Sequence, residues 1–516
     1  MPLSVKSSHR LLSVPAALVL SVFLALPPAH ASYAYYVGKN LTESGAVMIG
    51  GSGEEVSSHW LEIVPARDHP AGTTITVGVT ADAVIPGQLI TIPQAAHTYR
   101  YMQMAYSDFE GFPAPLTNGG VNEHQVAVRD VWAPSRDALV EMTPEGQRGV
   151  QYSDLARIVM ERATTAREGV EIIGELIAAH GFATYGGNTH MIADPDEGWI
   201  VWQLAGGQGL WVAERLGPDE IRVLYPGAIG DVPVDIDSDP DYLASDNFIS
   251  FAEEQGWYDR AADEPFNAFR VYGPQDIEDY RDPGIKLMSP ADMEAATRAM
   301  APVSEADLME RVRDPRVVDD DAGYGQVVSL HDDLADPDLV RMWAAPTGSV
   351  TAPFNVWWLG VQEVPMEYAQ HRYLTKDSAS TFLNPDFQMQ EATRFAGRVF
   401  KRVMYYTCSA PDTLLPVVTD MLTGFEGETR QDLPWVERTA RTMIESGDRE
   451  AAQALLTHYA TGRAMDALDL GTTLADSLDA YTRLVTGQRR PVSDGINTFD
   501  PTVNCLAGGD PDTPQP

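Results

Sequence analysis

The feature that most constrains this chain is its beginning, because residues 1–31 differ in character from everything that follows. Lys6 and Arg10 are the only charges there, an apolar run extends from Leu11 to Leu26, and Ala29-His30-Ala31 closes the segment. A basic start, a short apolar run and an A-x-A site make up a secretory signal. The run is shorter than the roughly 20 residues that span a bilayer. We therefore expect cleavage after Ala31, a secreted or periplasmic protein, and a folded chain that begins at Ser32.

The net charge of the chain limits the classes of partner that it is expected to bind. It has 74 acidic and 36 basic residues, a formal net charge of −38, and the excess is spread along the sequence. Nucleic acids and anionic membranes are bound through patches of Lys and Arg, so neither is expected as a partner once the signal is removed. Cys408 and Cys505 are the only cysteines. Export permits a disulfide, so we expect these two to pair.

The order of predicted elements favours an α+β fold. Residues 34–37 and 46–49 predict a hairpin around Thr42–Gly45, and 73–77, 125–131, 199–204 and 210–213 predict further strands. Thr165 and Glu168 form a capping-box pattern ahead of a helix that ends at Gly181. After about residue 385 the chain becomes helical, with three or four helices expected. The expected segments are a signal at 1–31, a mixed domain at 32–385, a helical region at 386–486 and a Pro/Gly-rich tail at 487–516.

A mature chain that begins with serine carries a nucleophile and a base on one residue. The α-amine has a pKa of about 7.7–8.0 in model compounds, so at neutral pH it can accept the hydroxyl proton directly or through a water. Before cleavage the same nitrogen is an amide and cannot act as a base. A strand is predicted directly after Ser32, which would hold the nucleophile in place. Since small polar residues often follow an A-x-A site, an ordinary mature terminus is the simpler interpretation of this feature taken alone.

Blocks of sequence in a fixed order resemble peptidase family C69 (U34), a family of Ntn-hydrolase dipeptidases. The likeness begins with Ser32–Lys39 and Gly45–Ile49. It continues through residues 64–70, 92–101, 120–127, 162–170, 187–195, 211–213 and 266–267, and is looser from Arg341 onward. The resemblance implies a four-layer αββα sandwich, hydrolysis of dipeptides without metal or cofactor, and an acyl-enzyme on the first mature residue, Ser32.

The chain departs from the family pattern in three places. Ser32 stands where the family has Cys, although other Ntn hydrolases use Ser. Gly50–Glu55 stands where the family has an Arg that would hold substrate or tune the amine. Tyr225–Gly230 stands where members carry an Asn near an Ile-Gly pair. These departures put the specificity for dipeptides in doubt more than they put the hydrolytic reaction itself in doubt.

Further candidate substrate or oxyanion contacts are Asn122, Glu123, Tyr225 and Glu54. Asn122 and Glu123 precede a strand, and a turn-capping Asn with a solvated Glu is an equally good interpretation. The Tyr225 hydroxyl could replace the missing Asn as an oxyanion donor. Glu54, with Glu55, could bind a free amine, although loop carboxylates are more often only solvated. His97, His124 and His190 lack the spacing of a zinc site, so no metal is expected.

Three functions remain open from the sequence. The first is a secreted dipeptidase with Ser32 as nucleophile. The second is an amidase or acylase acting on N-acyl amides, which the missing Arg motivates. The third is a non-catalytic secreted binding protein on the same fold. The sequence does not indicate side-chain preference, physiological substrate or oligomeric state.

Overall fold

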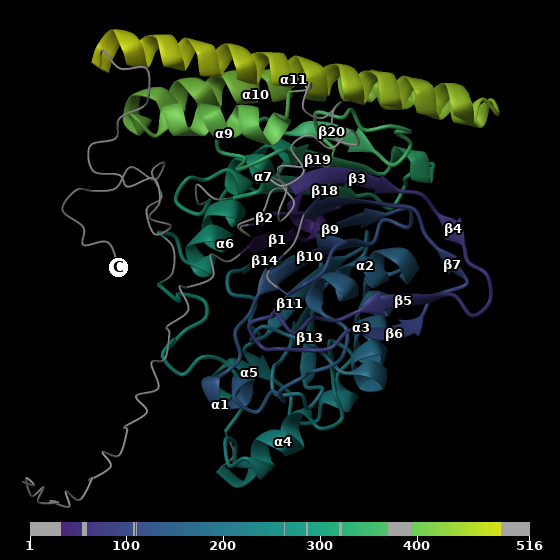
Figure 1. Cartoon of the computed structure of the whole chain (residues 1–516), viewed down its shortest axis with the longest axis vertical. Helices are drawn as coiled ribbons and strands as arrows, with labels where there is room; N and C mark the ends of the chain where they lie inside the picture. Colours follow the sequence, from purple (N-terminus) through teal and green to yellow (C-terminus); the bar gives the residue numbers. More distant parts are fainter. Residues whose placement is uncertain are drawn as a thin grey trace, which may run out of the picture.

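The fold is described by a computed structural model that covers residues 32–53, 59–106, 109, 111–262, 264–284, 287–318, 322–369 and 394–486. Two antiparallel sheets and a layer of long helices dominate it (Figure 1). The predicted signal at 1–31, Glu54 and the tail from 487 lie outside the described residues.

The six-stranded sheet has the order β14-β1-β2-β18-β19-β20. Its strands are β14 (Ile221–Leu224), β1 (Tyr33–Val37), β2 (Val47–Gly53), β18 (Tyr324–Leu330), β19 (Arg341–Ala345) and β20 (Asn355–Trp358). β1 therefore lies between β2 and β14, where both of its edges are paired and its backbone is fixed. All five residues of β1 are buried.

The eight-stranded sheet has the order β16-β13-β12-β11-β10-β9-β8-β3. Its strands are β16 (Tyr242–Ala244), β13 (Trp211–Leu216), β12 (Gly198–Gln203), β11 (Asn188–Ala193), β10 (Ala127–Trp132), β9 (Leu116–Asn122), β8 (Tyr101–Tyr106) and β3 (His59–Val64). The five strands from β12 to β8 are buried almost throughout, which is the pattern of a sheet covered on both faces.

The two sheets face each other, and each carries helices on its outer side. β10 contacts β1 and β2 across the space between the sheets. Helices α2 (Tyr152–Arg162) and α3 (Ala166–His180) pack on the eight-stranded sheet, and α6 (Pro290–Arg298), α7 (Glu305–Val312) and α11 (Arg449–Thr486) pack on the six-stranded sheet. The layers are therefore helix, sheet, sheet, helix, and the predicted αββα fold class is confirmed.

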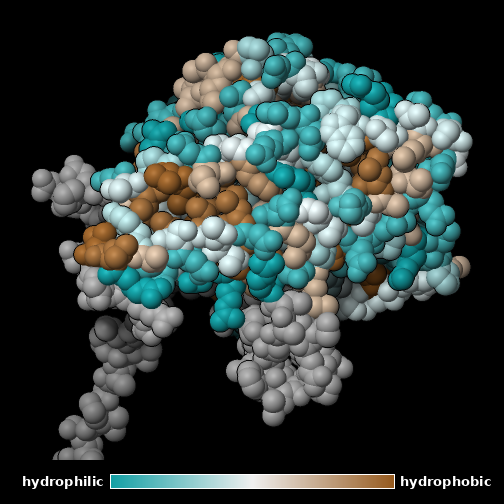
Figure 2. Space-filling view, turned by 90° about the horizontal axis from the view of Figure 1, so that it is seen from above, coloured by the Kyte–Doolittle hydropathy of each residue, from teal (hydrophilic) through white to brown (hydrophobic). Residues whose placement is uncertain are grey.

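The C-terminal helices form the outermost layer on the six-stranded side (Figure 1). They are α9 (Ala396–Thr407), α10 (Pro411–Glu445) and α11, and α10 and α11 form a long antiparallel pair. Figure 2 shows apolar side chains gathered on this face. The exposed large apolar residues of α10 and α11 are Val417, Met421, Trp435, Tyr481, Leu484 and Val485. Among the described residues no helix is long and apolar enough to cross a membrane.

The remaining elements are short. Three two-stranded sheets pair β4 (Arg67–Asp68) with β7 (His97–Thr98), β5 (Thr74–Val77) with β6 (Ile90–Pro93), and β15 (Asp231–Val232) with β17 (Phe266–Asn267). The short helices are α1 (Asp137–Val140), α4 (Phe248–Glu254) and α5 (Ala268–Tyr272). They lie toward the end of the sandwich that is farthest from the long helices in Figure 1.

Local sequence signals account for most of the elements. The predicted hairpins become β1–β2 and β12–β13, and the strands predicted at 73–77 and 125–131 become β5 and β10. The helix predicted at 165–180 is α3, with Thr165 accepting a hydrogen bond from Glu168 N and with Gly181 at φ 85°. The capping box is only half formed, because the Glu168 carboxylate accepts from Thr164 N at 2.7 Å instead of from Thr165.

Candidate active site

Ser32 lies directly before β1 and is 4% exposed. Its strand is fixed on both sides, since Tyr33 pairs with Ser52 of β2 and Ala34 pairs with Leu224 of β14. Continuing the register by one residue brings Ser32 beside Gly53. The sheet therefore holds the backbone of Ser32 at the end of a central strand, as the proposed chemistry needs.

The alternation along β1 places the Ser32 side chain between the two sheets. Tyr33 and Tyr35 point to the helical side, because their hydroxyls donate to the carbonyls of Val312 and Arg311 at α7. Tyr36 points the opposite way, since its ring covers Gly198 of β12 so closely that a Cβ there would lie 2.5 Å from it. Side chains two residues apart share a face of a strand, so Ser32 shares the face of Tyr36.

Glycines allow close strand pairing at this end of the six-stranded sheet and in the facing sheet. Gly51 has φ 153°, and a Cβ there would lie 2.1 Å from the Tyr33 carbonyl oxygen. Gly119 of β9 has φ 112°, and a Cβ there would lie 1.9 Å from the Val128 carbonyl oxygen. The glycine-rich stretch that replaces the family's Arg is thus part of β2 itself, packed against the residue that follows Ser32.

Arg129 of β10 reaches this region from the facing sheet and was missed by the sequence reasoning. Its side chain is fully buried. Nη2 donates to the Ser52 carbonyl at 2.9 Å, and Nη1 donates to the Tyr324 hydroxyl. The guanidinium also lies over the Tyr324 ring, 5.0 Å from its centroid. Ser52 pairs with Tyr33, and adjacent strands are about 4.8 Å apart, so the guanidinium is within roughly 10 Å of Ser32.

A polar and aromatic cluster adjoins Tyr324. The His59 ring lies 4.9 Å from the Tyr324 ring and 5.1 Å from the Tyr106 ring between centroids. His59 Nε2 and Asn118 Oδ1 are 2.8 Å apart. Sequence reasoning had no signal for His59 and Asn118, because they come from β3 and β9 and are brought together only by sheet pairing through β8.

Asn122 and Glu123 lie at the opposite end of the sandwich from Ser32. Val121 pairs with Ala127, Ala127 pairs with Ala193, and Ala193 pairs with Gly198. These residues therefore lie at one end of the eight-stranded sheet, where the Tyr36 ring covers Gly198. The Ser32 end is marked instead by Gly227, which follows β14 and donates its N–H to the Trp132 carbonyl at the other end of β10. The structure therefore does not bring Asn122 or Glu123 to Ser32.

The side chains of Asn122 and Glu123 have structural partners. Asn122 Nδ2 donates to the carbonyls of Met160 and Ala163, and its Oδ1 accepts from the backbone of His124 and Val126. Glu123 accepts from Arg100 N at 2.8 Å. The oxyanion or substrate role considered for them is corrected to a turn that joins β9, β10 and the end of α2.

Tyr225 is the other predicted site residue that the structure places near Ser32. It directly follows β14, whose Leu224 pairs with Ala34, and it is 1% exposed. Glu54 follows Gly53 in the chain but lies outside the described residues. Cys408 is buried at the end of α9. Its expected partner Cys505 is also outside them, so the disulfide stays a prediction.

Burial sets the protonation of several groups in the sandwich. It raises the pKa of the Tyr35 and Tyr36 hydroxyls, which therefore remain donors to backbone carbonyls. Burial lowers the pKa of His190 to about 4, and its Nε2 lies 2.9 Å from the Tyr152 carbonyl oxygen. His190 is therefore neutral at physiological pH. Across the described part of the chain, no three His, Cys, Asp or Glu side chains gather as metal ligands would.

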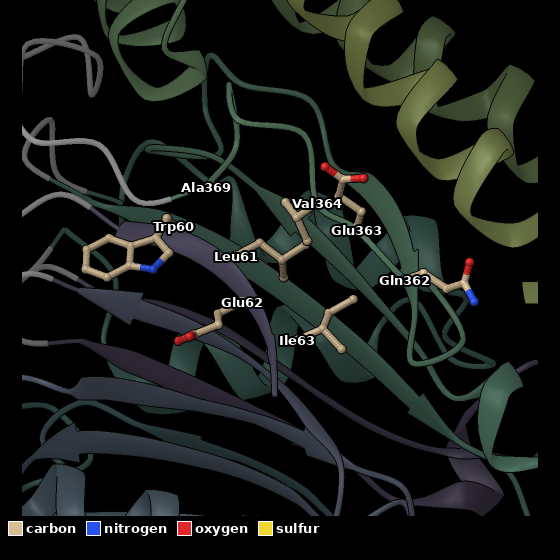
Figure 3. Close-up of a pocket in the computed structure, with 8 residues that line it drawn as sticks. All are labelled: Trp60, Leu61, Glu62, Ile63, Gln362, Glu363, Val364 and Ala369. Atoms are coloured by element: carbon tan, nitrogen blue, oxygen red, sulfur yellow. The ribbon is translucent and has the colours of Figure 1, made fainter. Parts of the chain in front are cut away.

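A pocket of 260 Å³ lies elsewhere, between edge strand β3 and residues 362–369 (Figure 3). Its lining residues are Trp60, Leu61, Glu62, Ile63, Gln362, Glu363, Val364 and Ala369. The lining contains no hydroxyl, thiol, imidazole or amine that could act as a nucleophile, and Glu62 accepts a hydrogen bond from Gln103 at 2.9 Å. We therefore do not assign the reaction to this pocket.

The segment that builds this site matches a known family. Residues 35–283 match the family model described as "Peptidase family C69". This stretch of the chain is similar to peptidase family C69. The match includes β1 from Tyr35 onward, β2, β14 and the whole eight-stranded sheet, and it begins just after Ser32. The C69 segment therefore supplies both strands beside β1 and also Arg129.

Proteins named as dipeptidases are similar to part of this chain. A "Probable dipeptidase B" of Streptococcus pyogenes serotype M3 is 27% identical over 262 residues, which cover 50% of this chain and 49% of the relative. A "Dipeptidase" of Bifidobacterium longum is 29% identical over 180 residues, or 31% of this chain and 33% of the relative. The chain spans about half the length of the S. pyogenes relative that it matches.

A solved structure of a mutant conjugated bile acid hydrolase from Clostridium perfringens covers 67% of this chain and 98% of its own, at 10% identity and a TM-score of 0.33. The four layers described above rest on the strand pairing and helix packing of this chain.

Proposed function

We propose that this protein is an exported dipeptidase whose nucleophile is the Ser32 hydroxyl, exposed when residues 1–31 are removed. The observation that carries the proposal is the placement of Ser32. It precedes β1, which is paired on both edges, and the alternation along β1 directs its side chain to the space between the sheets. The adjoining segment matches the model of peptidase family C69, and relatives of this chain are named dipeptidases. In the uncleaved chain the Ser32 nitrogen is an amide, so export would also activate the enzyme.

The reaction would proceed in two stages on this geometry. The Ser32 hydroxyl attacks the scissile carbonyl while its own α-amine accepts the proton, directly or through a water, and later returns it to the leaving amine. Water then hydrolyses the ester on Ser32 by the reverse proton path. The tetrahedral oxyanion needs donors. Asn122 is too far away, and the Tyr225 hydroxyl remains the candidate among the residues considered from sequence.

The second candidate function is an amidase or acylase acting on N-acyl amides. The observation that favours it is Gly50–Gly53, which leaves β2 without the cationic side chain that the family resemblance implies. The choice between the two functions depends on whether the enzyme recognises the free ends of a dipeptide. A dipeptidase should hydrolyse an unblocked dipeptide faster than its N-acetylated form, whereas an acylase should show the reverse order.

Substitution of Ser32 tests the proposal. Ser32→Ala keeps the α-amine and the strand, and removes only the attacking oxygen. We expect kcat/KM on a panel of unblocked dipeptides to fall by roughly 10³-fold or more, with little change in Tm. Ser32→Cys should retain activity with an optimum at lower pH, because a thiol has a pKa of about 8.5.

A Ser32→Ala protein as active as wild type would leave Ser32 as a mature terminus only. The non-catalytic binding protein would then be the better interpretation of the fold.

A further inference from the structure

Arg129 differs from the other buried arginines in what surrounds its charge. The buried arginines of the described residues are Arg129, Arg157 and Arg313. Arg157 contacts Asp154 and Glu161, each at 3.2 Å, and Arg313 binds Glu426 through two hydrogen bonds. No carboxylate of the described residues forms an ion pair with the Arg129 guanidinium. Its partners are a carbonyl, a hydroxyl and an aromatic ring.

An uncompensated buried cation is costly to the fold. Moving an ion of this size out of water costs several kcal/mol even after the protein relaxes, and a carboxylate normally offsets that cost. A carbonyl and a hydroxyl offset only part of it, and Nε has no hydrogen-bond partner among the described residues. An anion that entered this space would therefore be bound strongly, because the described part of the protein supplies no competing anion.

The position of Arg129 identifies which anion fits. Its guanidinium contacts the carbonyl of Ser52, the strand partner of the residue that follows Ser32. In a dipeptide only the nitrogen and Cα of the second residue separate the scissile carbonyl carbon from the terminal carboxylate carbon. The carboxylate carbon therefore lies about 4 Å from the scissile carbonyl carbon. A leaving residue that extends from Ser32 toward Ser52 directs this carboxylate to the guanidinium of Arg129, which donates to the Ser52 carbonyl. A planar guanidinium suits a carboxylate, which it binds through two parallel hydrogen bonds.

We propose that Arg129 is the residue that binds the free carboxylate of the substrate, and so restricts hydrolysis to peptides that end one residue after the scissile bond. The cation that β2 lacks is supplied by β10 of the facing sheet. This inference rests on the proposed function. It names the substrate class as amides with a carboxylate on the carbon next to the leaving nitrogen, which includes dipeptides and N-acyl amino acids.

The kinetic test compares two substrates, Ala-Ala and its C-terminal amide. The protein is produced from the full chain and processed to Ser32. Wild type should prefer Ala-Ala. Arg129→Met should lower kcat/KM on Ala-Ala by on the order of 100-fold, the usual loss when one partner of a buried charged pair is removed, and change kcat/KM on the amide by less than about threefold. Arg129→Lys should have a kcat/KM on Ala-Ala between those of wild type and Arg129→Met, because the lysine ammonium keeps the charge but cannot form two parallel hydrogen bonds.

Arg167→Met is the matched control. It removes one positive charge from a half-buried position of α3, where Arg167 pairs with Glu171 at 3.1 Å and lies over the Trp199 ring. It should leave kcat/KM unchanged on both substrates. If Arg129→Met does not fold, Arg129→Lys carries the comparison, with the preference for Ala-Ala reduced about tenfold. Equal losses on Ala-Ala and its amide, or no loss on either, would overturn the carboxylate role.

A binding measurement separates this inference from the proposed reaction. Ser32→Ala protein cannot form the ester, so Ala-Ala should raise its Tm without being consumed, and the amide should raise it less. With both compounds, the Tm of the Ser32→Ala/Arg129→Met protein should rise only as little as the amide raises the Tm of Ser32→Ala protein. Wild type that hydrolyses neither compound, combined with this Arg129-dependent shift, would contradict the dipeptidase and leave the carboxylate site standing. Hydrolysis by wild type without any Arg129-dependent shift in Tm would support the dipeptidase and contradict the carboxylate site.

Discussion

Two buried regions of this protein each contain an arginine, and the two arginines have different kinds of partner. Between α7 and α10, Arg313 is held by Glu426, and Glu426 also accepts from Phe354 N at 2.8 Å. Between the two sheets, Arg129 has neutral partners only among the described residues. The first region is a closed network that joins helices to the sheet. In the second, we propose that the charge binds the carboxylate of a substrate. Both arginines are buried, so burial alone does not distinguish them, and the proposal for Arg129 rests on the neutral character of its described partners.

The largest expected effect on stability is at Arg313. Arg313→Met leaves the Glu426 carboxylate buried without its cation, so the free energy of unfolding should fall by about 3–5 kcal/mol. Arg129→Met removes a charge that has no ionic partner among the described residues, and the loss should be smaller by at least ~2 kcal/mol. Urea unfolding of both proteins measures the difference.

Removing both members of the Arg313 pair provides the control. Arg313→Met/Glu426→Met should recover most of the stability lost by Arg313→Met, since no buried charge is then left alone. If Arg129→Met proved as destabilising as Arg313→Met, the Arg129 guanidinium would be a structural element like its counterpart, and the contrast between the two regions would fail.

A smaller effect is expected at the Asn122 end of the sandwich. Asn122→Ala leaves the carbonyls of Met160 and Ala163 without their donor, which should cost about 1–3 kcal/mol of stability. Because Asn122 lies at the other end of the sheets from Ser32, kcat/KM of the folded protein should not change. A drop in kcat with an unchanged Tm would restore the catalytic role that the geometry argues against.

Much of the fold follows from local sequence signals. The Thr42–Gly45 turn, the Gly206–Gly209 turn and the Thr165 cap each predict their element, because the signal and the structure it causes lie within a few residues. The family resemblance added the layer order. The long-range pairings of the six-stranded sheet could not be predicted, since β14 pairs with β1 and β18 pairs with β2 across long stretches of intervening chain.

The candidate site was predictable only in part. Ser32 could be proposed because the predicted cleavage site and the first strand both lie beside it in the sequence. Asn122 has the residue type of an oxyanion donor, yet its turn lies at the wrong end of the sandwich, which only the strand register reveals. Arg129 carried one overlooked signal, a charged residue at a position of β10 that alternation directs to the core beside Ala127 and Val131. Without the facing sheet, nothing in the sequence connected it to Ser32.

The most direct test of the account concerns the α-amine of Ser32. Two proteins would be compared on the same unblocked dipeptides, one beginning at Ser32 and one that retains Ala31 before it, with mass spectrometry confirming each N-terminus. The added residue leaves the Ser32 hydroxyl, Arg129 and the fold in place, and converts the proposed base into an amide. We predict that the Ala31 protein keeps its Tm and loses kcat/KM by at least ~100-fold. Equal activity of the two proteins would contradict catalysis by an N-terminal serine.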